Sequence, residues 1–175
     1  MKLNIAICDD DEKDIEKLRD FLTSYYIARD TDLEIDSFTS GEDLFKSYTR
    51  ANDYQILLLD VEMPSMNGLE VADMVRTNID KHTIIVFISS YPKYMQDSFR
   101  VHPFYYLTKP VSLENIYDLM DNIVAEINDS HIIFSLIDTD EKSTTINIRD
   151  VLYIETENSK NGILNFHFKD SNIIT

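Results

Sequence analysis

The chain has 175 residues, of which 43% are hydrophobic, and its formal net charge is −16. This composition supports one ordinary domain with a small additional piece, or two small domains, and it excludes global disorder. The acidic balance leaves no basic surface of the kind that nucleic-acid binding normally needs. No run of 18 apolar residues occurs, so no membrane span is expected. The single cysteine, Cys8, cannot form an internal disulfide, which favours a reducing cytoplasm.

Apolar runs alternate with amphipathic segments along residues 1–128. In chain order, strands are predicted at residues 3–8, 33–38, 56–59, 83–88 and 104–107. Helices are predicted after the first strand, from Ser40 with Asp43 approximating a capping box, after Asn67-Gly68, at about 93–100, and from Ser112. The alternation predicts an α/β domain with a five-stranded, parallel, doubly wound sheet. The continuous apolar strands fit a sheet that is buried on both faces.

The pattern changes after residue 128. Short β-prone runs occupy residues 132–137, 144–148, 151–155 and 163–168, with turn-rich segments at 138–143 and 158–162. This indicates a short β-rich segment after the α/β domain. We therefore assign a first domain to residues 1–128, a linker to residues 129–131 and a second, β-rich unit to residues 132–175.

Polar residues follow several of the predicted parallel strands. The carboxyl ends of such strands meet at one rim of the sheet, where reactive groups gather. This rule brings together Asp9 and Asp10, Asp60, Ser89 and Lys109, although they are far apart in sequence. Clustered carboxylates repel one another unless a cation lies between them. Mg²⁺ accepts such ligands and bridges phosphate oxygens, so the rim suits phosphoryl transfer with a carboxylate as the nucleophile.

Four stretches together carry a family resemblance. They are residues 7–12 (ICDDDE), 59–70 (LDVEMPSMNGLE), 87–90 (FISS) and 106–110 (YLTKP). Over residues 1–128 the chain resembles the receiver domain of two-component response regulators, which implies a flavodoxin-like fold. The resemblance implies a phosphoacceptor protein, rather than an enzyme, that takes its phosphoryl group from a sensor histidine kinase with Mg²⁺ as the cofactor.

The resemblance also implies a role for each matching residue. Asp60 corresponds to the phosphoacceptor. Asp9 and Asp10 correspond to the acidic pair that binds Mg²⁺ together with Asp60 and the backbone carbonyl of Glu62. Because three aspartates stand in a row, Asp11 remains an alternative to Asp10 as the direct ligand.

Four further positions match the family. Lys109 corresponds to the lysine that contacts the phosphate, and it precedes Pro110 through a peptide bond that is commonly cis in this family. Ser89 and Tyr106 correspond to the pair that changes conformation on phosphorylation. Ser90 stands where a small residue, often alanine, controls access to the site. A homodimer through the switch face is a further expectation from the resemblance.

The tail resembles the opening of a LytTR-type DNA-binding domain over residues 145–155 (TINIRDVLYIE) and would cover about half of it. The resemblance implies control of transcription, with DNA as a partner of an intact protein. Lys160, Asn161 and Lys169 are the nearby candidates for DNA contact, but turn and edge-strand roles explain them better. Residues 130–175 hold four basic and seven acidic residues. We therefore expect weak or no DNA binding by these 175 residues.

Two alternative functions stay open at this point. One is a stand-alone receiver that acts through protein contacts only, with the tail as a packing hairpin. The other is a phosphatase of the haloacid-dehalogenase type, suggested by Asp9-x-Asp11, although Lys13 breaks that motif and Asp60 stays unexplained. Among the remaining residues, Cys8 is expected in the core. Tyr91 and Phe99 are also assigned to core packing, in preference to a partner surface.

Overall fold

The computed structural model describes residues 2–130, 133–137, 143–147, 151–156, 164–168 and 173–174. The backbone divides into two compact units, Met1–Asp121 and Asn122–Thr175. The first contains β1 (Lys2–Cys8), α1 (Glu12–Arg29), β2 (Asp32–Phe38), α2 (Gly41–Ser47), β3 (Ile56–Leu59), α3 (Gly68–Asn78), β4 (Ile84–Ser89), α4 (Met95–Ser98), β5 (Tyr105–Thr108) and the start of α5 (Leu113–Ser130). In the described residues, none of the helices is both long and apolar enough to cross a membrane.

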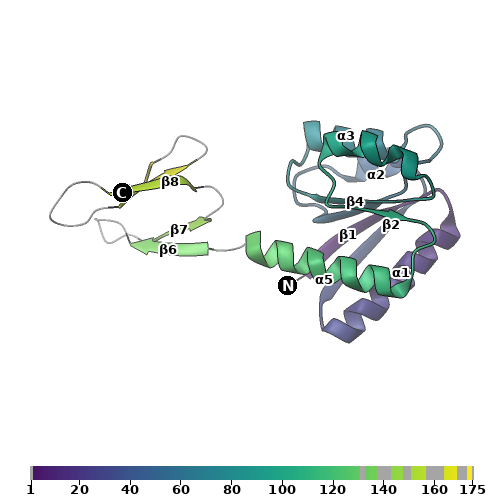
Figure 1. The fold of residues 1–175 in the computed structure, drawn as a ribbon, viewed down its shortest axis with the longest axis horizontal. Coiled ribbons are helices and arrows are strands. Elements are labelled where there is room, and N and C mark those ends of the chain that lie inside the picture. Colours follow the sequence, from purple (N-terminus) through teal and green to yellow (C-terminus); the bar gives the residue numbers. More distant parts are fainter. Residues whose placement is uncertain are drawn as a thin grey trace. The chain divides into compact units, whose positions relative to one another are not determined.

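The first unit is built on a five-stranded parallel sheet with the order β2-β1-β3-β4-β5. Helices α1 and α5 lie on one face, and α2 and α3 lie on the other (Figure 1). This arrangement confirms the predicted α/β, doubly wound fold. The strand order changes direction between β1 and β3, and loops beyond the carboxyl ends of strands at such a point commonly form binding sites.

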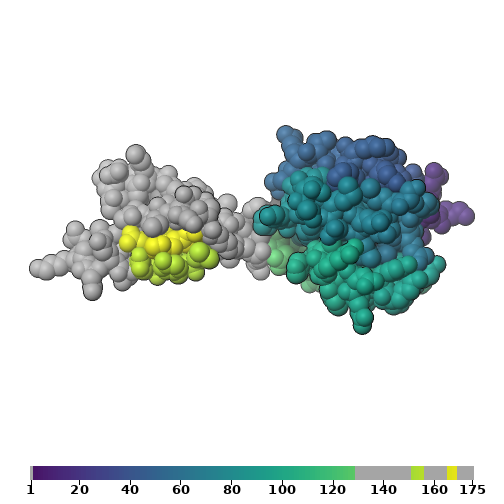
Figure 2. Space-filling view, turned by 90° about the horizontal axis from the view of Figure 1, so that it is seen from above, coloured from purple at the N-terminus to yellow at the C-terminus, as the bar shows by residue number. Residues whose placement is uncertain are grey.

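The strands at the centre of the sheet are buried on both faces. Ile56, Leu57, Leu58 and Leu59 of β3 are each at most 1% exposed, and the end of β1 is equally buried. Seen from the side of α2 and α3, the first unit presents a closely packed surface of atoms (Figure 2). Burial on both faces explains why these strands are continuously apolar in sequence instead of alternating. Cys8 lies in this core, as expected, and burial is the main reason why the pKa of its thiol rises to about 12.

Side chains cap the helices close to the predicted positions. The Asp11 carboxylate accepts a hydrogen bond from the amide of Lys13 at the start of α1, and the Ser40 hydroxyl accepts one from the amide of Asp43 at the start of α2. The complete capping box lies elsewhere, at the start of α3, where Asn67 and the glutamate three residues later cap one another.

The fourth helical segment is less regular than predicted. It consists of a 3₁₀ turn at Pro92–Tyr94, the short helix α4 and a second 3₁₀ turn at Phe99–Val101. The assignment of Tyr91 and Phe99 to the core is wrong, because the two residues are 43% and 64% exposed. A single irregular segment has few residues facing inward, and Val101 and Ser98 are the ones that this segment buries.

Gly68 allows α3 to begin close to the end of β3. A Cβ atom at this position would collide with the backbone oxygen of Asp60, and the Gly68 amide donates a hydrogen bond to the Val61 oxygen at 3.1 Å. No side chain fits in that space without moving the backbone of the Asp60 loop. The glycine in the 59–70 motif therefore has a steric explanation, because it brings the loop after β3 against the first turn of α3.

The second unit is described only in part. It contains the antiparallel pair β6 (Ile133–Ile137) and β7 (Ser143–Asn147), and a three-stranded antiparallel sheet of β8 (Val151–Thr156), β9 (Leu164–Phe168) and β10 (Ile173–Ile174). This confirms a small β-rich segment, and β10 is a strand that the sequence pattern did not indicate. Helix α5 continues to Ser130, so two of the three residues predicted as linker are helical. Residue 131 and the candidates Lys160, Asn161 and Lys169 lie outside the described residues.

Candidate phosphoryl-transfer site

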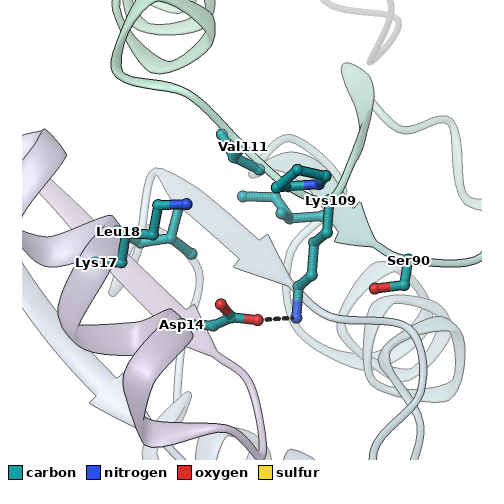
Figure 3. A pocket seen from close by; sticks show the side chains of 8 residues that line it. Asp14, Lys17, Leu18, Ser90, Lys109 and Val111 are labelled. Carbon is teal, nitrogen blue, oxygen red and sulfur yellow. Dashed lines mark ion pairs between the residues drawn. The ribbon is translucent and has the colours of Figure 1, made fainter.

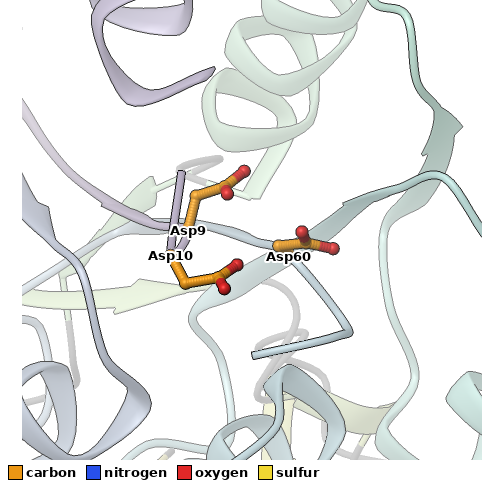
Figure 4. Close-up of side chains that lie close together, drawn as sticks. All are labelled: Asp9, Asp10 and Asp60. Atoms are coloured by element: carbon orange, nitrogen blue, oxygen red, sulfur yellow. The ribbon is translucent and has the colours of Figure 1, made fainter. Parts of the chain in front are cut away.

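Three aspartates meet at the carboxyl ends of β1 and β3. One carboxylate oxygen each of Asp9, Asp10 and Asp60 lies within 4.8 Å of the others, and Figure 4 shows these side chains side by side. Asp9 and Asp60 are buried and Asp10 is exposed. The parallel pairing of β1 with β3 places the two strand ends next to one another, and the Asp60 amide donates to the Cys8 oxygen at 2.8 Å. The predicted acidic rim is therefore present.

The backbone orients the two buried carboxylates. Asp60 Oδ1 accepts hydrogen bonds from the amides of Val61 at 2.6 Å and Glu62 at 3.3 Å, and Asp9 Oδ1 accepts one from the amide of Asp11 at 3.0 Å. Burial raises the pKa of Asp9, and its hydrogen bonds with Lys109 and Asp11 oppose that rise. The amide contacts leave the Oδ2 atoms of Asp9 and Asp60 directed to Lys109.

Lys109 supplies the positive charge of the rim from the loop after β5. Its Nζ lies 2.7 Å from Asp9 Oδ2 and 2.9 Å from Asp60 Oδ2. The Lys109 amide donates to the Ser89 oxygen at 3.0 Å, and the Lys109-Pro110 peptide bond is cis, as expected. Burial by itself lowers the pKa of Lys109, but hydrogen bonds with three carboxylates outweigh burial and raise it. The side chain is therefore held as an ammonium ion beside the Asp60 carboxylate.

Ser89 and Tyr106 lie on neighbouring strands but do not contact the carboxylates in the hydrogen bonds observed. Ser89 is fully buried at the end of β4, and its hydroxyl accepts a long hydrogen bond of 3.4 Å from the Tyr91 amide. Tyr106 is half-buried, and its hydroxyl donates to the Tyr91 backbone oxygen at 2.7 Å. Both side chains thus bond to the same residue of the segment that precedes α4.

The loop after β3 is linked to this segment through Glu62. Tyr94 donates a hydrogen bond from its hydroxyl to Glu62 Oε1 at 2.8 Å, and Lys93 Nζ lies 3.4 Å from the same oxygen. The Tyr94 hydrogen bond is the main reason why the pKa of Glu62 lies below its usual value. Lys93 also lies over the rings of Tyr91 and Tyr94, 5.0 Å and 4.6 Å from their centroids. The sequence pointed only to the backbone carbonyl of Glu62, and its side-chain contacts were not predicted.

Asp14 is a rim residue that the sequence analysis missed. Its Oδ2 lies 2.7 Å from Lys109 Nζ, as close as the Asp9 oxygen (Figure 3). A signal was present in the sequence, because Asp14 precedes Leu18 and Leu22 at intervals of four residues. Residues spaced in this way share one face of a helix, so Asp14 is expected on the same side of α1 as these two buried leucines.

The donor set at the rim suits a hard cation and an anionic group. Carboxylate oxygens are the ligands that Mg²⁺ prefers, and the Asp9, Asp10 and Asp60 oxygens are close enough together to share one ion. The carboxylate of Asp11 instead accepts the hydrogen bond that caps α1, at 2.9 Å from the Lys13 amide. An anionic group next to Asp60 would meet the Lys109 ammonium. The arrangement supports positioning and charge stabilisation, which are the main requirements of phosphoryl transfer.

Comparison with protein families identifies one matching family model. The model described as the response regulator receiver domain matches residues 5–121. Those residues include the whole rim, strands β2 to β5 and the second half of β1. The match ends before the β-rich segment begins.

Curated relatives and solved structures agree with this match. The sensory transduction protein LytT from Oceanobacillus iheyensis is 32% identical over 125 residues, which are 70% of this chain and 48% of that protein. The transcriptional regulatory protein BtsR from Escherichia coli is 31% identical over 111 residues, 62% of this chain and 43% of that protein. The chain thus spans about half the length of the curated relatives it matches. Response regulator TrrA from Thermotoga maritima, solved in complex with Mg²⁺-BeF, superposes with a TM-score of 0.58 at 28% identity, covering 70% of this chain and 99% of that one.

Proposed function

The chain belongs to the response regulator receiver family, and from that premise we propose that Asp60 accepts a phosphoryl group from the phosphohistidine of a sensor kinase. The observation that carries this proposal is the position of Asp60. Its Oδ2 faces the Lys109 ammonium at 2.9 Å, and two further carboxylates lie beside it. A buried carboxylate oriented by backbone amides can act as a nucleophile while the ammonium attracts the phosphoryl oxygens.

The acidic rim fits Mg²⁺. We assign Asp9, Asp10 and Asp60 and the backbone carbonyl of Glu62 as its ligands, and the capping role of Asp11 favours Asp10 over that alternative. The Mg²⁺-BeF complex of TrrA supports the choice of metal. When bound, the ion supplies positive charge that offsets the phosphoryl oxygens. The residues of the chain itself position the nucleophile and, through Lys109, hold one side of the transferred group.

The change in shape is assigned to Ser89 and Tyr106. The Ser89 hydroxyl at the end of β4 accepts a long hydrogen bond from the Tyr91 amide and also contacts the Tyr106 hydroxyl, and a phosphoryl oxygen can compete for it. The Tyr106 hydroxyl donates a hydrogen bond to the Tyr91 oxygen and also contacts Ser89, so a movement of Ser89 would change the position of Tyr106. In this proposal, phosphorylation shifts the population between two positions of the segment before α4. A homodimer through this face stays a prediction, and the exposed Tyr91 and Phe99 support it.

We further propose that the output of the intact protein is transcription control through a LytTR-type domain. The similarity to LytT and to transcriptional regulators supports this, as does the β-rich segment after α5. The alternative of a stand-alone receiver rests on the same first unit and differs only in the role of the tail.

Phosphorylation is tested by incubating the chain with Mg²⁺ and radiolabelled acetyl phosphate. The wild type is expected to gain acid-stable, base-labile label, because an acyl phosphate forms on a carboxylate. The variant Asp60→Asn should lose the label, and Asp20→Asn, an exposed change on α1, should keep it. Removal of Mg²⁺ with a chelator should strongly reduce labelling. Full labelling of the Asp60→Asn variant would overturn the assignment of the acceptor.

A further inference from the structure

The Lys109 ammonium has three carboxylate partners, and only two of them belong to the proposed phosphorylation site. Asp9 and Asp60 lie at the strand ends, whereas Asp14 reaches Nζ from the first turns of α1. An ammonium group has three N–H donors, so these three contacts use all of them. The Asp14 carboxylate is 37% exposed and the Lys109 side chain is 14% exposed, so Asp14 contacts Lys109 from the solvent side.

Asp14 changes the balance of charge at the rim. Four carboxylates, those of Asp9, Asp10, Asp14 and Asp60, lie around one ammonium, and all but Asp10 contact it. One bound Mg²⁺ would still leave one negative charge, and without Asp14 the same group of residues would be neutral. Lys17 also lines the cavity beside Lys109, while the protein as a whole carries a net charge of −16.

Asp14 borders an open cavity beside Lys109, the cation that contacts the phosphoacceptor. A cavity of about 300 Å³ is lined by Asp14, Lys17, Leu18, Ser90 and Lys109, with Ile88, Pro110 and Val111. Figure 3 shows that Asp14 and Ser90 approach the end of the Lys109 side chain from opposite sides. A small molecule that enters this cavity toward Lys109 therefore passes close to the Asp14 carboxylate.

We propose that Asp14 is a specificity-determining residue that slows phosphorylation of Asp60 by small, doubly charged phosphodonors. This inference rests on the proposed function of Asp60. Asp14 repels an anionic donor at the cavity and draws part of the Lys109 charge away from the incoming phosphoryl group. A phosphohistidine on a sensor kinase is also held by contacts between the two protein surfaces. The same repulsion by Asp14 therefore lowers the rate of transfer from the kinase less than the rate of transfer from a small donor.

The reaction with a small donor shows why charge matters. An oxygen of the Asp60 carboxylate forms a bond to the phosphorus of acetyl phosphate. The bond between that phosphorus and the acetyl oxygen breaks, and acetate leaves with the electron pair. No proton is transferred, so two anions must approach one another without neutralisation. Phosphoramidate carries one negative charge fewer because its nitrogen is protonated, and it leaves neutral ammonia behind.

The test compares initial rates of Asp60 labelling in the full chain with Mg²⁺. The variant Asp14→Asn should react with acetyl phosphate about threefold to tenfold faster than wild type at low ionic strength. The gain should be smaller with phosphoramidate, and it should shrink as potassium chloride is added, because salt screens charges on the surface. Asp14→Glu keeps the charge and should behave like wild type.

Asp20→Asn is the matched control, because it removes the same charge from the same helix at an exposed position away from the rim. An equal gain for Asp14→Asn and Asp20→Asn would show an effect of net charge only and would overturn the proposal. A slower reaction of Asp14→Asn would do the same, since Asp14 would then assist the transfer. Absence of labelling in wild type and all variants would instead contradict the proposed function itself.

Discussion

At the scale of single residues, Asp80 shows how one buried carboxylate organises the edge of the sheet opposite the rim. Its Oδ1 accepts hydrogen bonds from the amides of His82 at 2.7 Å and Thr83 at 3.1 Å, and its Oδ2 accepts from the Tyr48 hydroxyl and the Asn52 amide, both at 2.9 Å. Burial by itself raises the pKa of Asp80, but these hydrogen bonds outweigh it and lower the pKa. Because all four groups donate hydrogen bonds to Asp80, they stabilise its ionised carboxylate.

The variant Asp80→Asn should therefore destabilise the fold. The amide nitrogen of the new asparagine would face two hydrogen-bond donors that bond to a carboxylate oxygen in the wild type. We therefore expect the free energy of unfolding at pH 7 to fall by about 2 kcal/mol. Because the pKa of Asp80 is lowered in the folded state, its contribution is present above the pKa of the unfolded chain, about 4. That contribution is lost as the pH falls through the folded-state value.

Urea unfolding at several pH values checks this prediction. The difference between wild type and Asp80→Asn should narrow below about pH 4. Asp73→Asn, an exposed change on α3, serves as the control and should alter stability by no more than a few tenths of a kcal/mol. A difference that stays constant down to pH 3 would show that the ionised state of Asp80 is not the source of stability.

At the scale of elements, α1 and α5 are joined by a polar contact near the end of α1. The Tyr25 hydroxyl donates to Asp121 Oδ1 at 2.8 Å, and Arg29 makes two hydrogen bonds to the same carboxylate at 3.1 Å and 2.7 Å. The rings of Tyr25 and Tyr117 meet edge to face with centroids 5.4 Å apart. This contact holds the end of α1 against α5, while Asp14 lies near the start of α1.

The variant Tyr25→Phe should keep the packing of the ring and lose its hydrogen bond. Tyr25 is only 2% exposed, so we expect the free energy of unfolding to fall by about 1 kcal/mol. Tyr26→Phe is a matched control one residue further along α1, where the side chain is 45% exposed, and it should be close to neutral. Chemical denaturation measures both, and an equal loss for the two variants would contradict a specific contact between α1 and α5.

At the scale of the whole molecule, acidic charge limits what the chain can bind. The net charge is −16, and the β-rich end adds seven acidic to four basic residues over 130–175. Affinity for DNA comes largely from cations that neutralise phosphates, so a negatively charged protein gains little from a nearby duplex. The proposed transcriptional output therefore needs more positive surface than these residues supply.

We expect no DNA complex with the 175-residue chain. A gel-shift measurement with duplexes of mixed sequence at low salt should show no retarded band, with or without phosphorylation of Asp60. A sequence-specific band that weakens as salt is raised would contradict this expectation. The control is a basic DNA-binding protein run with the same duplexes, which should shift them under these conditions.

Local sequence signals were sufficient for the order of elements and for most of the rim. Apart from β2, where acidic and apolar residues alternate, the strands in the first unit read as apolar runs. Asp9, Asp10, Asp60 and Lys109 follow strand ends, so the rule for parallel sheets brings them together. Helix caps such as Ser40 are also local, because they depend on residues two or three positions apart. The family resemblance then supplied roles that spacing alone cannot assign.

Tertiary structure decided the features that depend on partners far along the chain. Asp14 contacts Lys109, and Tyr25 contacts Asp121, although the partners in each pair are far apart in the sequence. The sequence pattern of one helix does not specify which residue packs against it. The exposure of Phe99 also follows from the irregular backbone around α4, which the sequence pattern does not indicate. The chain alone thus determined which residues end its strands, because that information is local. Packing decided which carboxylates share the single ammonium of the rim, because that depends on how α1 lies against the loop after β5.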